Sequence, residues 1–111
     1  MKEDASKFVN ACISKGEGEE SGDTRHDRKY WRIINKIYVR LKSEHRLSEL
    51  LELLEHENPY VRLWAACYTL QIDETKAVTA LEELAATQKL MAGFSASITL
   101  KEWRAGRLNV E

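Results

Sequence analysis

The chain has 111 residues, of which 43% are hydrophobic and 32% are charged, and its net charge is −1. This composition is sufficient for one packed domain over residues 1–111, and it excludes a disordered segment, a disulfide scaffold and a transmembrane helix. A single proline and five glycines also argue against an all-β fold.

The first predicted helix covers residues 2–15, where Phe8, Cys12 and Ile13 lie close to one apolar stripe. The next eight residues, 16–23, contain three glycines and four acids and therefore have no apolar face to bury. We predict that this segment is a mobile acidic loop.

A second, amphipathic helix is predicted over residues 24–44, with Asp23 or Thr24 as its N-cap. Trp31 and Val39 fall outside its apolar stripe. The stripe follows the 3.6-residue period of a helix and consists of Tyr30, Ile33, Ile34, Ile37 and Leu41.

Two further helices are predicted on either side of Asn58 and Pro59, because asparagine is a good cap and proline is favoured in the first turn. The helix before them covers residues 47–57, with inward positions Leu47, Leu50, Leu51 and Leu54. The helix after them covers residues 58–72, with inward positions Val61, Ala65, Tyr68 and Ile72.

The last two predicted helices cover residues 73–87 and 93–108. Asp73 is expected to cap the first, whose inward positions are Ala77, Leu81 and Leu84. Gly106 is expected to end the second, whose inward positions are Phe94, Ile98 and Trp103. Six helices without a credible strand indicate an all-α fold.

An internal repeat relates residues 51–70 to residues 81–100. The identical pairs are Leu51 and Leu81, Glu52 and Glu82, Leu54 and Leu84, Ala66 and Ala96, Thr69 and Thr99, and Leu70 and Leu100. Two helix pairs of one design give such a pattern, so we predict an α-solenoid of about six helices in three antiparallel pairs.

The segment LLELLEHENPYVRLWAACYTL, residues 50–70, resembles a HEAT-type unit, although Leu70 lies one place later than the usual leucine. The matching positions are Leu50, Leu51, Leu54, Asn58, Pro59, Val61, Arg62, Ala65 and Ala66. The whole chain is also similar to a family of small bacterial HEAT-like domains of uncharacterised function. HEAT-like proteins of this size recur among bacterial immunity proteins, which bind and block a cognate toxin. The resemblance implies a binding scaffold without naming its partner.

Charge is sorted by helix along the chain. Residues 24–44 carry seven basic and two acidic residues, residues 47–57 carry four glutamates, and residues 73–87 carry four acids and one lysine. In a stack of helix pairs, the second helices would share a basic surface and the first helices an acidic one. A surface with one sign of charge attracts partners whose surface carries the opposite charge.

No pattern in the sequence indicates catalysis. The three histidines, His26, His45 and His56, lack metal-ligand spacing, and neither a base nor an orienting group is visible for Cys67. The acidic 16–23 segment would repel phosphate. We therefore predict a non-enzymatic protein without metal or cofactor.

The first functional hypothesis is a protein-binding module, specifically an immunity protein that sterically blocks a bacterial toxin domain. Nuclease toxins are commonly basic, so acidic residues are expected to make the contact, together with aromatic residues typical of binding hot spots. The predicted contact residues are Glu49, Glu52, Glu55, Glu57, Glu82, Glu83, Trp31, Tyr60 and Trp64. The start of the chain lacks the apolar core of a signal peptide, so we expect a cytoplasmic protein that does not bind membranes.

The alternative is a nucleic-acid-binding protein that uses a basic face on residues 24–44. That face would consist of Arg25, Arg28, Lys29, Arg32, Lys36 and Arg40. An overall pI of about 6.3 argues against it. A scaffold or regulatory subunit is a further alternative that the sequence does not separate from an immunity protein.

Overall fold

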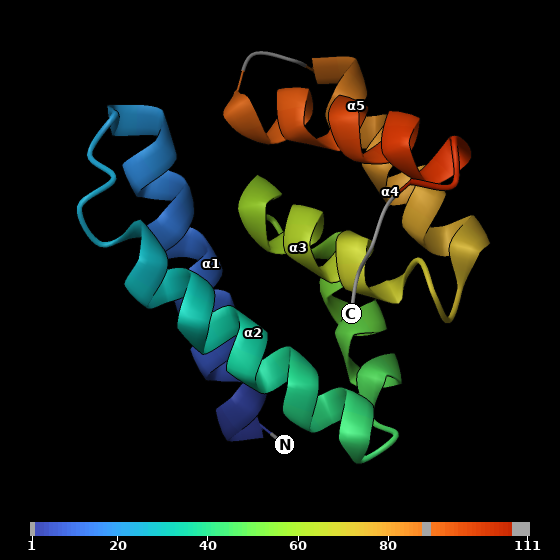
Figure 1. Ribbon diagram of the computed structural model, residues 1–111, viewed down its shortest axis with the longest axis horizontal. Helices are drawn as coiled ribbons and strands as arrows, with labels where there is room; N and C mark the ends of the chain where they lie inside the picture. The colour runs from blue at the N-terminus through green and yellow to red at the C-terminus, as the bar shows by residue number, and fades with distance from the viewer. Residues whose placement is uncertain (1, 88–89, 108–111) are drawn as a thin grey trace.

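The computed structural model describes residues 2–87 and 90–107, which form six helices and no strand (Figure 1). The prediction of an all-α fold is therefore confirmed for this part of the chain. The elements are α1 (Lys2–Ser21), α2 (Asp27–Ser43), the 3-10 helix η1 (Leu47–Glu55), α3 (Pro59–Thr69), α4 (Glu74–Thr87) and α5 (Met91–Arg104).

Helix α1 continues to Ser21, so the prediction of a loop over residues 16–23 is wrong for most of that segment. Two features hold the additional turns in place. Gly16 is buried against α3, and Lys15 forms ion pairs with Glu19 at 3.2 Å and with Asp27 of α2 at 2.8 Å. The glycine that looked like a source of flexibility instead permits close packing.

Helix α2 begins at Asp27, and the predicted caps Asp23 and Thr24 lie before it. The buried residues of α2 are Ile34, Ile37, Tyr38 and Leu41, while the predicted core residues Tyr30 and Ile33 are only half-buried. Tyr38 was missed because it lies at the edge of the aliphatic stripe. Its ring stacks on Tyr68 of α3 with a centroid distance of 4.1 Å.

The elements η1 and α3 meet at Asn58 as predicted. The Asn58 side chain accepts hydrogen bonds from the backbone N–H groups of Tyr60 at 2.9 Å and Val61 at 3.3 Å. Leu47, Leu50 and Leu54 are buried, and Leu51 is half-buried. The predicted inward residue Ile72 is 45% exposed, because α3 ends at Thr69 and its register does not continue.

Helix α4 confirms its prediction, because Ala77, Leu81 and Leu84 are buried and the Asp73 carboxylate accepts a hydrogen bond from the N–H of Lys76 at 3.2 Å. Helix α5 ends at Arg104, and Gly106 follows with a left-handed φ of +72°. The predicted end of this helix at residue 108 lies outside the described residues.

Helix α5 presents the opposite face to the one predicted. Its buried residues are Ala92, Gly93, Ala96 and Leu100, whereas Phe94 is 56% exposed and Ile98 is 49% exposed. Three of the four buried residues are small, so they let α5 approach its neighbours closely, and the large apolar side chains remain outside. Trp103 is half-buried, and its indole N–H donates a hydrogen bond to Glu74 at 2.7 Å.

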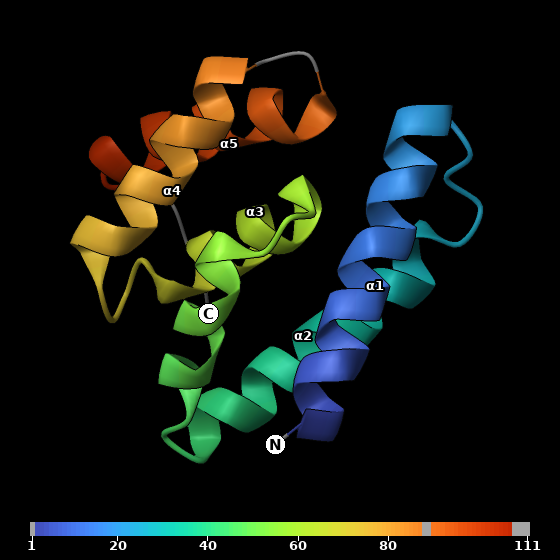
Figure 2. The same cartoon turned by 180° about the vertical axis from the view of Figure 1, so that it is seen from behind.

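The core lies around α3, which packs against α1, η1, α4 and α5. Helices α1 and α2 lie side by side at one end of the molecule and α4 and α5 at the other (Figures 1 and 2). The Phe8 ring of α1 meets the edge of Tyr68 with a centroid distance of 6.4 Å. No helix in the described ranges has the length and apolar character needed to cross a membrane.

Consecutive elements pack in pairs, α1 with α2, η1 with α3, and α4 with α5. Helix α1 packs along α3 and also reaches α5, while α2 contacts the acidic η1. Basic α2 therefore neighbours an acidic element, and the separation of the chain into one basic and one acidic surface stays a prediction.

Candidate functional site

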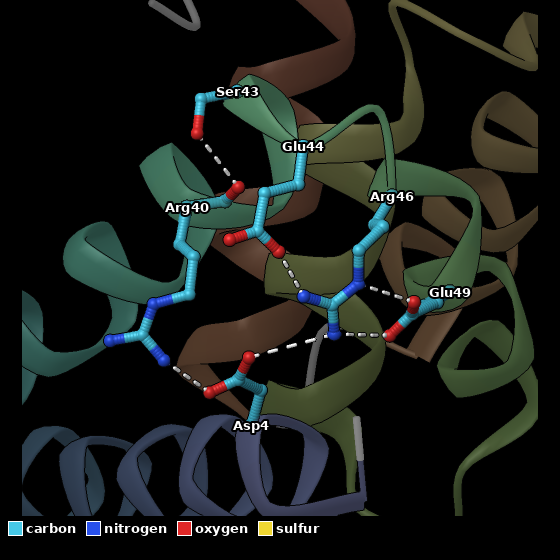
Figure 3. Close-up of polar contacts among 6 residues, drawn as sticks. All are labelled: Asp4, Arg40, Ser43, Glu44, Arg46 and Glu49. Atoms are coloured by element: carbon cyan, nitrogen blue, oxygen red, sulfur yellow. Dashed lines mark hydrogen bonds and ion pairs between the residues drawn. The ribbon is translucent and has the colours of Figure 1, made fainter.

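A polar network joins α1, α2 and η1 at the corner of the molecule where α2 ends (Figure 3). Asp4 of α1 is 6% exposed, and its carboxylate accepts a hydrogen bond from Arg40 at 2.6 Å, while Arg46 lies 3.6 Å from its other oxygen. Arg46 also pairs with Glu44 and, at 2.7 Å, with Glu49. The hydrogen bonds from Arg46 lower the pKa of Glu49 below its ordinary value.

The predicted acidic contact residues divide into two groups. Glu49 pairs with Arg46, and Glu82 pairs with Arg104 of α5 at 2.7 Å, so both carboxylates have partners within the chain. The other four are exposed and form no ion pair with a residue that the structure describes: Glu52, Glu55, Glu57 and Glu83.

The predicted basic residues divide in the same way. Arg25 pairs with Asp23 at 2.9 Å, and Arg40 pairs with Asp4. The Lys29 ammonium lies 5.8 Å from the centre of the Tyr30 ring. Four of the predicted basic residues are exposed and have no ion pair among the described side chains: Arg28, Lys29, Arg32 and Lys36.

The three aromatic candidates lie in different environments. Trp31 is 44% exposed on α2. Tyr60 is 4% exposed, and its hydroxyl donates a hydrogen bond to Glu20 of α1. Trp64 is half-buried beneath the Lys15 ammonium, which lies 5.6 Å from its ring centre. Only Trp31 among these three has an exposed large surface, so we assign packing roles to Tyr60 and Trp64.

A groove of about 480 Å³ runs between α1 and α2. Its apolar lining includes Ala11 of α1 and Ile33 and Ile37 of α2, and its cationic lining includes Lys7 and Lys36. The periodicity of α2 alone could not predict this groove, because it depends on how α1 crosses α2.

A second surface feature is a row of large apolar side chains on and just before α5, which we call the α5 apolar stripe. Its residues are 40–56% exposed: Leu90, Met91, Phe94 and Ile98. They recur with helical spacing and therefore lie along one face. Sequence reasoning found Phe94 and Ile98 but assigned them to the core.

The thiols offer no accessible nucleophile. Cys12 is fully buried, and burial raises the pKa of its thiol; burial also raises the pKa of the half-buried Cys67 to about 11. No cluster of three His, Cys, Asp or Glu side chains arranged to hold a metal ion occurs within residues 2–87 and 90–107.

The architecture and these surfaces define a small all-helical domain whose described surface offers an apolar stripe and a cation-lined groove. The chain belongs to the family described as "Domain of unknown function (DUF2019)", whose model matches residues 5–103. The predicted membership of an uncharacterised domain family is thus confirmed. Comparison with functionally curated proteins gives no match.

A crystal structure of the protein RPA1889 from Rhodopseudomonas palustris is similar to this chain, with a TM-score of 0.90 and 20% sequence identity. The similarity covers 99% of this chain and 93% of that one. At this identity the likeness concerns the fold.

Proposed function

We propose that this protein is a non-enzymatic protein-binding module that acts through contact. The observation that carries the proposal is the α5 apolar stripe, in which Phe94 is 56% exposed and Ile98 is 49% exposed. Contiguous exposed apolar side chains of this size often mark protein interaction sites, because water contact with them is unfavourable. Burying the phenylalanine and isoleucine in a partner would recover that free energy.

The occupant we propose is a protein other than this chain, with an apolar contact surface and a polar rim. Lys101 and Glu102 follow the stripe on α5 and supply charges of both signs at its end. Such mixed charges around an apolar centre are typical of specific protein interfaces.

We extend the proposal to the arrangement of the helices and to the class of partner. The HEAT-like solenoid interpretation is supported by the NPYVRLWAA segment and by the way α3 packs among four other elements. The immunity hypothesis, in which the partner is a bacterial toxin domain, is supported by the resemblance stated above and by the lack of an evident nucleophile or metal cluster in the described residues. In that case the protein would block the toxin domain sterically, by covering its surface.

The nucleic-acid alternative has weaker support. Arg25 and Arg40 are engaged by Asp23 and Asp4, and the groove beside the cations of α2 has an aliphatic lining with Tyr30 at one end. Single-stranded nucleic acid is usually held by a basic groove that contains stacked aromatic residues.

Site-specific photo-crosslinking in the producing cells tests the proposal. A photoreactive residue is placed at Phe94 or Ile98, and matched controls carry it at the exposed apolar positions Val39 and Ile72, which are not part of the α5 apolar stripe. We expect one heterologous adduct that recurs at both α5 positions and is absent from the controls. The same adducts at all four positions, no adduct at all, or an adduct of two copies of this chain would contradict the proposal.

A further inference from the structure

The groove between α1 and α2 has the features of a peptide-binding groove and lies apart from the α5 apolar stripe. Its floor is apolar and consists of Ala11, Ile33 and Ile37, while Tyr30 lines one end and Arg40 the other. At 1.5 Å per residue, the distance along α2 from Tyr30 to Arg40 is about 15 Å. A short helix or extended segment fits that length.

The charges around the groove favour an anion. Lys7 lies on the α1 side and Lys36 on the α2 side, and both are exposed. Among the described residues that line the groove, Asp4 is the only acidic one, and it forms ion pairs with Arg40 and Arg46. The lysines therefore set the sign of the groove's electrostatic potential.

The cationic rim continues along α2 beyond the groove. Lys29, Arg32 and Lys36 follow one another at intervals of three or four residues, and therefore lie along one side of the helix. A row of cations beside an apolar floor complements a ligand that has carboxylates along one edge and apolar side chains next to them.

We propose that the groove binds an acidic amphipathic peptide segment of a protein partner. The apolar side chains of that segment lie on Ile33 and Ile37, and its carboxylates face Lys7 and Lys36. The apolar floor favours a peptide over a polynucleotide, whose phosphates would gain nothing from isoleucine. This inference rests on the proposed protein-binding function but assigns a second surface and the charge of what binds there.

The probe is a synthetic helical peptide of about ten residues, with glutamates along one face and leucines along the other, which matches the groove in length. Binding to the full chain is measured by fluorescence anisotropy, and backbone amide NMR shifts locate the site. We expect shifts concentrated at Ala11, Ile33 and Ile37, and binding about fivefold weaker in Lys36→Glu. Lys7→Glu should weaken binding similarly.

Lys76→Glu is the matched control, because it makes the same charge change at an exposed position on α4, outside the groove and the α5 apolar stripe. It should leave peptide affinity nearly unchanged. Equal loss in Lys36→Glu and Lys76→Glu, equal binding of a lysine–leucine peptide, or preferential binding of a single-stranded oligonucleotide would overturn the groove assignment. If the peptide does not bind the groove but the heterologous adduct at Phe94 still forms, only this inference is wrong. If that adduct does not form, the proposed function itself is wrong.

Discussion

Gly16 of α1 lies directly against the ring of Tyr60 of α3. A Cβ atom built on Gly16 would come within 2.2 Å of the Tyr60 Cδ2 atom and 2.3 Å of Cγ. The Tyr60 hydroxyl donates to Glu20, whose carboxylate also accepts a hydrogen bond from the Met91 backbone N–H at 2.8 Å. One turn of α1 therefore joins the N-terminal ends of α3 and α5.

Gly16→Ala should destabilise the protein even though alanine is the better helix former. The new methyl group would overlap the Tyr60 ring, and overpacking of this kind costs about 1–3 kcal/mol, against a gain in helix propensity of about 1 kcal/mol. Urea denaturation should show a lower midpoint. Glu17→Ala, at the next and exposed position, is the control and should keep or raise the midpoint. A Gly16→Ala variant as stable as the control would contradict the close contact.

Asp4→Asn should cost about 1–3 kcal/mol of unfolding free energy, because it removes a nearly buried carboxylate from two arginines. Asparagine keeps the size of the side chain, so the loss reports on charge. Glu52→Gln makes the same charge change on an exposed residue and should change stability little. Similar values for the two variants would show that the network contributes nothing to stability.

Stability should fall on acidification in a way that depends on Glu49. Hydrogen bonds from Arg46 hold the native pKa of Glu49 below its ordinary value of 4.5. The unfolded state therefore takes up the proton first, so this contribution is present above pH 4.5 and is lost as the pH falls through the native pKa. Glu49→Gln should make the decline shallower, whereas Glu83→Gln should not. An unchanged slope in Glu49→Gln would refute this link.

The two thiols should resist modification in the native protein. Cys12 is fully buried, and burial raises the pKa of Cys67 to about 11, so little thiolate forms at pH values near 8. A disulfide reagent such as Ellman's should label neither thiol until denaturant is added. Rapid labelling of either thiol in the native chain would contradict this expectation.

Phe94→Ser should leave stability within about 0.5 kcal/mol of the unaltered protein, because the side chain is 56% exposed. Ala96→Leu, two residues later on the buried face, should cost about 1–3 kcal/mol through overpacking. Thermal unfolding of the two variants distinguishes the observed face of α5 from the predicted one. If Phe94→Ser were the less stable of the two variants, Phe94 would belong to the core.

Local signals in the sequence predicted three of the helix ends, although they missed the end of α1 and the start of α2. The Asn58 cap, the Asp73 cap and the turn at Gly106 all depend on a few neighbouring residues whose chemistry is legible without the rest of the fold. The leucines of η1 and α4 also gave the correct inward faces, because large aliphatic residues there alternate with exposed glutamates.

Tertiary contacts explain the errors. A glycine next to acidic residues is typical of a loop in a sequence. The contact with the Tyr60 ring, which only the structure shows, explains why residue 16 must be glycine. In α5 both faces are apolar, so periodicity could not distinguish small inward residues such as Ala96 from large outward ones such as Phe94. The groove, likewise, arises from the crossing of α1 and α2.

Hydrogen–deuterium exchange on the chain, alone and with the partner captured at Phe94, tests the central claim most directly. We predict that amide protection on binding is concentrated in α5, residues 91–104. Protection confined to residues 47–55 and 74–87, the acidic elements that the sequence favoured, would contradict it.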